Sequence, residues 1–150
     1  MLSHRVLILA SATALFGTVL LQGGVAEALP ECVDTIGVSS HTDIDGGVGQ
    51  LREALSEVCD GGSVLIEPGT IVLERGRFTI EESRTVTIIG LGNGDEPEVA
   101  IDANGTDRIF TVNAHAALTL DSVRLTGGNV VGHGGAVEAL DARLVVIDST

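Results

Sequence analysis

Short apolar runs separated by turn residues fill the chain from Val64 onward. Each run is rich in β-branched and aliphatic side chains, and most of the runs are separated by Gly, Asn, Asp or Pro. No run is followed by an amphipathic helix of about 10 to 15 residues, so the strand–helix alternation of an α/β sheet is excluded. The pattern predicts an all-β fold. The runs are 64–66, 71–73, 78–80, 86–89, 99–101, 110–112, 118–120 and 123–125.

Two of these runs recur at similar intervals. The run 64–66 recurs as 86–88 after 22 residues, and the phrase 118–122 recurs within 144–149 after 26 residues. A coil of parallel strands that rises about 4.8 Å per turn needs such a repeat, whereas the strands of a sandwich do not. The alternative is chance repetition in a chain rich in Val, Ile and Thr. We therefore predict a parallel β-helix of about four rungs, with aliphatic side chains stacked inside it.

One helical pattern precedes the runs. Leu51, Ala54, Leu55 and Val58 recur at the spacing of a single helix face, and the turn 60–62 follows them. So short a helix is not stable alone in water, so its apolar stripe must cover another surface. We expect a capping helix that lies over the open end of the first rung.

The first residues have the three parts of an export signal. Arg5 precedes the apolar run 6–21, and Ala26 and Ala28 occupy the small-residue positions before a cleavage site. We predict a signal peptide over residues 1–28. The alternative is a retained membrane anchor, because the run approaches the roughly 17 residues that span a bilayer. No second hydrophobic span follows, so the expected location is secreted or at the cell surface.

After the signal we expect an N-terminal segment over residues 29–62, which carries the capping helix, and β-helix rungs over 63–150. Past Ser149 the last rung should continue with an apolar strand and a turn, as residues 123–128 do one repeat earlier. We expect either an N-terminal piece of a longer protein or a last rung that another chain completes. Self-association through this open C-terminal rung is therefore one expected contact.

The net charge limits the classes of binding partner, and the cysteines bear on the redox state of the cellular compartment. The chain has 21 acidic and 8 basic residues, for a formal net charge of −13, so it would repel phosphates and nucleic acid is not an expected partner. Its two cysteines, Cys32 and Cys59, either pair in an oxidising compartment or stay free. Pairing would stabilise the fold by roughly 3 kcal/mol and tie the leading segment to the helix.

Several motifs in a shared order carry a family resemblance. The segment 49–55, Gly-Gln-Leu-Arg-Glu-Ala-Leu, resembles the signature of the CSLREA domain, with Gly49-Gln50 where that family often has Cys-Ser or Cys-Thr. That domain is the N-terminal module of secreted bacterial right-handed parallel β-helix proteins of pectin-lyase-like fold, so the resemblance implies right-handed winding and export. The other matching motifs lie at 67–70, 86–90, 101–105, 108–110 and 118–128.

A second resemblance is to polymorphic outer-membrane proteins. Their repeats carry Gly-Gly-Ala-aliphatic and Phe-x-x-Asn tetrapeptides, and this chain has one copy of each, at 134–137 and 110–113. Such proteins are typically surface-exposed and often adhesive. The resemblance implies display outside the cell and identifies no ligand.

The chain contains few of the residues that a polysaccharide-cleaving enzyme of this fold would need for catalysis. Pectin-lyase-like folds host polysaccharide lyases, which need a strong base beside Ca²⁺-binding acids, and glycoside hydrolases, which need two facing carboxylates. The chain has no lysine. Asp121 and Arg124 lie near one another in a predicted strand region, but outward charges on a coil usually only solvate its surface. We expect no catalytic residue.

Candidate metal ligands also have ordinary structural explanations. Asp43 and Asp45 resemble the start of a calcium loop, without its remaining ligands, and a plain turn is the alternative. His115 and His133 lie near turns, without a Cys or carboxylate at ligand spacing. We therefore expect no bound metal or other cofactor.

One modification motif stands apart from these. Asn104-Gly105-Thr106 matches the N-glycosylation sequon, but in the bacterial context that the resemblance implies the same residues more simply supply a tight turn.

The sequence thus favours an exported, non-enzymatic β-helix module that serves as a surface stalk or adhesin-like scaffold, with a host surface or an extracellular polysaccharide as partner. The competing hypothesis is the N-terminal part of a carbohydrate-active enzyme, a polysaccharide lyase or glycoside hydrolase. A groove with convergent charged residues along one outer face would distinguish the enzyme.

Overall fold

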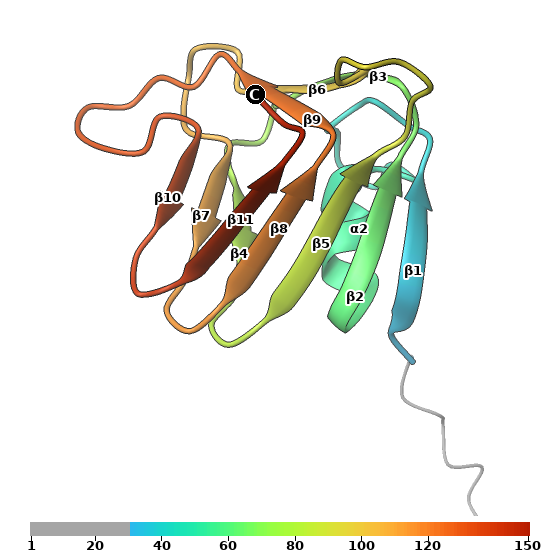
Figure 1. The fold of residues 1–150 in the computed structure, drawn as a ribbon, viewed down its shortest axis with the longest axis horizontal. Coiled ribbons are helices and arrows are strands. Elements are labelled where there is room, and N and C mark those ends of the chain that lie inside the picture. Colours follow the sequence, from blue (N-terminus) through green and yellow to red (C-terminus); the bar gives the residue numbers. More distant parts are fainter. Residues whose placement is uncertain (1–30) are drawn as a thin grey trace, which may run out of the picture. The chain divides into compact units, whose positions relative to one another are not determined.

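Three parallel sheets wind through residues 31–150, which are the residues that the computed structural model describes (Figure 1). The predicted signal peptide, residues 1–28, lies outside them. The elements are β1 (Val33–Val38), α2 (Leu51–Glu57), β2 (Val58–Ile66), β3 (Gly69–Val72), β4 (Phe78–Ile80), β5 (Thr85–Gly90), β6 (Val99–Asp102), β7 (Phe110–Val112), β8 (Ala117–Asp121), β9 (Val123–Thr126), β10 (Val137–Ala139) and β11 (Arg143–Ile147).

Each full turn of the chain contributes one strand to each sheet. Sheet A has the order β1-β2-β5-β8-β11, sheet B the order β3-β6-β9 and sheet C the order β4-β7-β10, and every pairing is parallel. The result is a β-solenoid of about four turns. The predicted all-β parallel coil is confirmed, and Cys32–Thr150 forms one compact unit. No helix among the described residues is long and apolar enough to cross a membrane.

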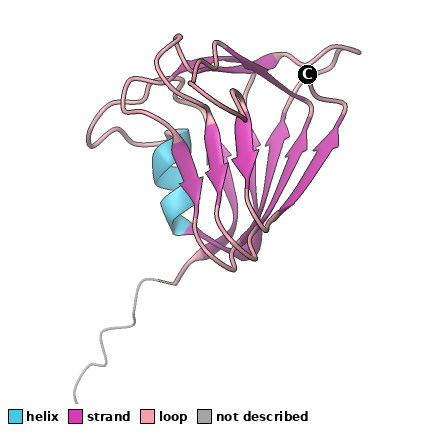
Figure 2. Ribbon diagram, turned by 90° about the vertical axis from the view of Figure 1, so that its left-hand side faces the viewer, coloured by secondary structure: helices cyan, strands magenta, loops and turns pink. Residues whose placement is uncertain are grey.

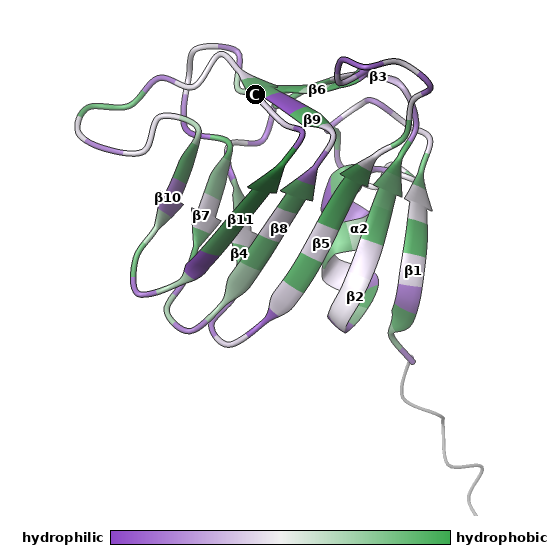
Figure 3. Cartoon of the chain, viewed as in Figure 1, coloured by the Kyte–Doolittle hydropathy of each residue, from purple (hydrophilic) through white to green (hydrophobic). Residues whose placement is uncertain are grey.

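Aliphatic side chains stack into columns, which are sets of register partners on successive turns. In sheet A one column contains Val64, Ile88, Leu120 and Val146. The first three are buried, whereas Val146 is 54% exposed because no described strand packs beyond β11. Figure 3 shows the hydrophobic bands repeating across neighbouring strands of this sheet. The period-2 alternation of the sequence therefore decides which side chains form the core.

The register corrects one of the two sequence repeats. Leu118 pairs with Leu144, so the 26-residue repeat is confirmed. Val64 pairs with Ile88, which is 24 residues later, so the 22-residue repeat with Val86 is wrong by two positions. A shift of two residues keeps the same face of the strand inward, and for that reason the prediction of the core survived the error.

The helix forms, but its predicted role as a cap is not supported. Its stripe residues Leu51, Ala54 and Leu55 are buried, and Val58 is buried as the first residue of β2. The outermost element of sheet A is the strand β1, which precedes the helix in the chain and pairs with β2. The helix lies within the first turn, beside β4 of sheet C (Figure 2).

The sequence also placed some boundaries wrongly at this end. The N-terminal segment 29–62, for which the sequence predicted the helix, also contains β1. The glycines of the turn 60–62, expected after the helix, lie inside β2, and β2 crosses the expected boundary between residues 62 and 63. Pairing between β1 and β2 supplies stability that local sequence does not show.

The connections between sheets differ sharply in length from corner to corner. Between sheets C and A they are uniformly short, at 81–84, 113–116 and 140–142. Between sheets B and C they lengthen from 73–77 through 103–109 to 127–136, and one long connection, 91–98, joins sheet A to sheet B. Exposed connections of varied length on a rigid column are where binding surfaces usually lie.

Candidate functional site

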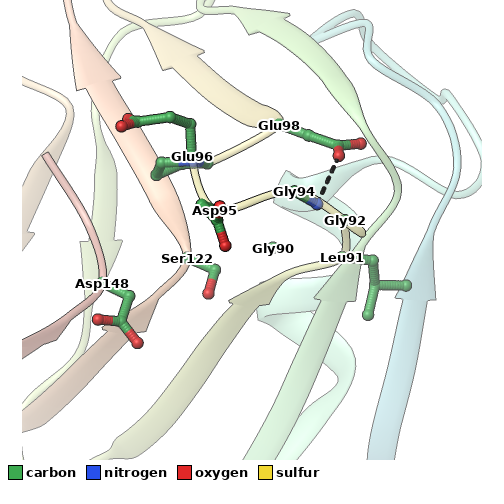
Figure 4. Close-up of a pocket in the computed structure, with 10 residues that line it drawn as sticks. Gly90, Leu91, Gly92, Gly94, Asp95, Glu96, Glu98, Ser122 and Asp148 are labelled. Atoms are coloured by element: carbon green, nitrogen blue, oxygen red, sulfur yellow. Dashed lines mark hydrogen bonds between the residues drawn. The ribbon is translucent and has the colours of Figure 1, made fainter.

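The acidic cleft lies at the corner between sheets A and B, where connection 91–98 folds over the turns of later rungs (Figure 4). Its volume is about 370 Å³. The Glu98 carboxylate accepts hydrogen bonds from the backbone N–H groups of Asn93 (3.1 Å) and Gly94 (3.0 Å), so it organises the connection. The lining residues are Gly90, Leu91, Gly92, Gly94, Asp95, Glu96, Pro97, Glu98, Ser122 and Asp148.

The carboxylates of the acidic cleft do not form a metal centre. Asp95, Glu96 and Asp148 come from two different turns and are exposed (Figure 4). In the described part of the chain, no three His, Cys, Asp or Glu side chains are placed to hold a metal ion. The cleft therefore presents a polar, negatively charged surface without convergent chemistry. The glycines and acidic residues at 90–98 are the feature of the sequence that could have indicated this cleft. They were not identified from the sequence as a candidate site.

A second cleft, the arginine cleft, lies between α2 and β4. Three guanidinium groups line it, from Arg52, Arg77 and Arg84. Arg84 donates to the carbonyl oxygens of Leu55 (2.9 Å) and Val58 (2.7 Å), at the end of the helix, where backbone acceptors lack helical partners. Arg84 therefore fastens the helix to the turn that precedes β5.

The Arg52 guanidinium, like that of Arg84, donates several hydrogen bonds within the protein. Its Nε and Nη2 donate to the two Asp43 carboxylate oxygens at 2.6 and 2.8 Å, and Nη2 also donates to the Gly76 carbonyl oxygen at 2.7 Å. Its guanidinium carbon lies 4.5 Å from the centroid of the Phe78 ring, a cation–π contact. Arg77 pairs with Asp107 at 2.9 Å. The positive charges of this cleft are consequently neutralised or bonded within the protein.

Asp43 is the most enclosed carboxylate of the region, with a side chain that is 1% exposed. It also accepts from the backbone N–H groups of Glu74 (3.1 Å) and Arg75 (3.0 Å). Burial raises the pKa of Asp43, but the hydrogen bonds and charge of Arg52 and the two N–H groups outweigh it and hold the pKa below the ordinary 3.8. Asp45, the other acid of the suspected calcium loop, pairs with Arg75 at 2.6 Å. Both carboxylates thus bind guanidinium groups.

The structure brings carboxylates to His115 that the sequence did not reveal. Its Nδ1 lies 3.9 Å from Glu82 and its Nε2 lies 3.9 Å from Asp141, which belong to the turns before and after it in the stack. They are distant in sequence, so their proximity comes only from stacking. The two acids face opposite nitrogens of the ring and cannot converge on one ion with it. His133 lies exposed in connection 127–136.

Asp121 and Arg124 are not brought together. Asp121 ends β8 in sheet A, and Arg124 lies in β9 of sheet B, on the other side of a sharp turn at Ser122. Asp121 instead accepts a hydrogen bond from the Ser122 hydroxyl at 2.9 Å. Their closeness in sequence therefore does not correspond to a shared site.

A disulfide joins Cys32 to Cys59, across a sequence separation of 27. It links the residue before β1 to the start of β2, so it holds the first turn closed. The Asp43 ion pair lies in the same first turn, and the arginine cleft lies between this turn and β4 of the next one. This end of the solenoid is therefore held by a covalent link and by ionic contacts.

The double variant Cys32→Ser/Cys59→Ser is expected to lose about 3 to 4 kcal/mol of unfolding free energy, because the unfolded chain regains the entropy of an open loop. Chemical denaturation of the purified chain measures the loss. Reduction of the wild-type protein should reproduce it, whereas reduction of the double variant should change nothing. Equal stability of wild type and variant would contradict the link.

Comparisons with known proteins bring no relative to this site. No family model, curated protein or solved structure matches the chain. The resemblances to the CSLREA domain and to polymorphic outer-membrane proteins therefore rest on the sequence motifs alone. Function has to be argued from the surfaces described above.

Proposed function

We propose that the chain is an exported, non-enzymatic β-helix module that acts as a surface stalk or adhesin-like scaffold. The observation that carries this proposal is a contrast between the column and its connections. Arg52 and Asp43 are bonded to each other inside the first turn, and Arg84 of the next turn donates to the backbone of the first turn. The two longest connections between sheets, 91–98 and 127–136, are largely exposed. A rigid column with projecting connections suits presentation of a binding surface.

Connection 127–136 is the best candidate for the presented surface. Its Val131 side chain is fully exposed, and Figure 1 draws the connection projecting from the column beyond β10. Its base is fixed, since Asn129 donates from its backbone N–H to the Asp107 carbonyl (3.0 Å) and from Nδ2 to the Gly105 carbonyl (2.9 Å). Because this connection has a fixed base and projects from the column, it is the segment that we propose contacts another macromolecule.

Side-chain composition favours a protein partner over a polysaccharide. The chain has no Trp or Tyr, and the described phenylalanines, Phe78 and Phe110, are at most 2% exposed. Among the described residues no aromatic face is therefore available to stack against a sugar ring. The net charge of −13 also opposes acidic polysaccharides. A protein on a host surface fits these properties better.

Adhesion provides the first test. Beads coated with the purified chain should bind host cells, and Val131→Asp should reduce binding at least about tenfold if the tip makes the contact, because a desolvated charge costs more than 1.4 kcal/mol. Val48→Asp is the matched control, since Val48 is 83% exposed on a different connection. Equal binding by Val131→Asp and wild type would remove connection 127–136 from the proposal.

An activity assay tests the competing enzyme hypothesis. The purified chain is incubated with neutral and acidic polysaccharides, with and without Ca²⁺, and the products are followed by ultraviolet absorbance and by reducing ends. We expect no products above the buffer control. Calcium-dependent release of unsaturated sugars would overturn the proposal in favour of a polysaccharide lyase.

Self-association through β11 is the remaining proposed contact. Leu144 and Val146 belong to inward-facing columns, yet they are 37% and 54% exposed. Sedimentation equilibrium should show a concentration-dependent dimer that Val146→Asp abolishes. A wild-type monomer at high concentration would end this part of the proposal.

A further inference from the structure

The sequon Asn104-Gly105-Thr106 lies in connection 103–109, between β6 and β7. The chain has four asparagines, and Asn104 alone is followed by Thr or Ser two residues later. The others are Asn93, Asn113 and Asn129. Nothing proposed above uses this motif.

The turn holds the backbone of the sequon firmly. The Asn104 backbone N–H donates to the Asp102 carboxylate at 2.8 Å, and the Gly105 N–H donates to the Gly127 carbonyl at 2.8 Å. The Thr106 hydroxyl donates to the Ala103 carbonyl at 3.0 Å. Asn104 has φ +55°, a left-handed conformation that asparagine adopts more readily than most residues.

The side chain of Asn104, by contrast, is free. It is exposed, and among the described residues its amide makes no hydrogen bond, whereas Asn113 and Asn129 donate theirs to Glu81 (3.3 Å) and to the Gly105 carbonyl (2.9 Å). A Cβ added at the next residue, Gly105, would meet no atom within 4 Å. Because the Asn104 side chain is exposed and makes no hydrogen bond among the described residues, a group on its amide would break no side-chain bond.

We propose that Asn104 is the acceptor of an N-linked glycan. The donor class is an oligosaccharide carried on a lipid pyrophosphate, and an oligosaccharyltransferase is the catalyst. A bond forms between Asn104 Nδ2 and the anomeric carbon of the first sugar. The bond from that carbon to the pyrophosphate oxygen breaks, the lipid pyrophosphate leaves with the electron pair, and the amide proton passes to a base on the transferase. Occurrence in the cell rests on the proposed export.

The attached glycan lies beside the presented connection. The Gly105 carbonyl receives the Asn129 side chain from connection 127–136, so the two segments are in direct contact. A glycan on Asn104 consequently flanks the proposed adhesive tip and shields the base of that connection from proteases.

The test uses the full purified chain with an oligosaccharyltransferase and its lipid-linked donor, and reads intact mass. This reaction needs no export, so its failure is separate from failure of the proposed function. We expect a mass increase of one glycan on the wild type. Asn104→Gln and Thr106→Ala should abolish it, Thr106→Ser should retain it, and Asn113→Gln should leave it unchanged.

Two results would overturn the inference. One is an unmodified wild-type chain beside a modified control peptide that spans residues 98–110. The other is a mass increase that persists in Asn104→Gln. Thr106→Ala keeps Asn104 and its φ angle, so it remains informative if Asn104→Gln folds poorly. The glycosylated chain should keep the circular dichroism spectrum and thermal midpoint of the unmodified one.

Discussion

Replacing Asp43 by Asn is expected to lower the free energy of unfolding by about 3 kcal/mol. The side chain is 1% exposed, and its two oxygens accept from the Arg52 guanidinium and from the N–H groups of Glu74 and Arg75. Asn keeps the shape but brings an N–H₂ group toward these donors and removes the negative charge beside Arg52. Breaking one partner of an enclosed pair costs more than the pair itself contributes, because the other charge is left uncompensated.

Chemical denaturation measures this loss, and Asp45→Asn is the matched control. Asp45 also pairs with an arginine, but its side chain is 87% exposed, so its removal should cost less than about 1 kcal/mol. A double-mutant cycle between Asp43 and Arg52 should give a coupling energy well above that of Asp45 with Arg75. Similar losses for Asp43→Asn and Asp45→Asn would mean that the enclosure of Asp43 has no energetic consequence.

The same carboxylate should make stability depend on acid. Burial raises the pKa of Asp43, but the bonds from Arg52, Arg75 and Glu74 bring it below 3.8 in the folded protein. A group with a lowered folded pKa contributes stability that is present above the unfolded value and is lost as the pH falls through the folded value. The stability difference between wild type and Asp43→Asn should therefore be constant near neutral pH and shrink below about pH 4. A difference that grows in acid would contradict the sign.

The inward columns were predictable from the sequence because their signal is local. Alternation of apolar and polar residues over a few positions identifies a strand and its inward face, as it does for β5 and β8. The strand β1 lacks this signal, since Asp34, Thr35 and Gly37 interrupt its apolar positions. It forms because β2 offers a parallel edge to pair with. That contribution is tertiary and invisible in the segment itself.

Contacts between successive turns of the solenoid could not be predicted from the sequence, because the number of residues per solenoid turn varies. Along one column the step is 24 residues from Val64 to Ile88, 32 to Leu120 and 26 to Val146. Each change comes from connections such as 91–98, whose length no repeat specifies. The neighbours of His115 and the bonds of Arg84 follow from that stacking. The glycines and acidic residues of connection 91–98 are visible in the sequence. The sequence does not show that they lie beside Asp148.

Phe110→Ala is expected to cost about 4 kcal/mol, the largest effect of a single apolar truncation in this chain. The side chain is fully buried in the central strand of sheet C, between its register partners Phe78 and Val137. The rings of Phe78 and Phe110 lie 5.4 Å apart. Truncation leaves a cavity inside the column and removes the aromatic contact between successive turns.

Chemical denaturation measures the loss for Phe110→Ala, with Ile147→Ala as the control. Ile147 lies on β11 and is 42% exposed, so its truncation should cost less than about 1.5 kcal/mol. Phe110→Leu retains most of the apolar volume and should recover more than half of the loss. If Phe110→Ala cost no more than Ile147→Ala, the side chain at position 110 would not be enclosed by neighbouring turns. The stacking of sheet C, and with it the fixed base of connection 127–136, would then have to be abandoned.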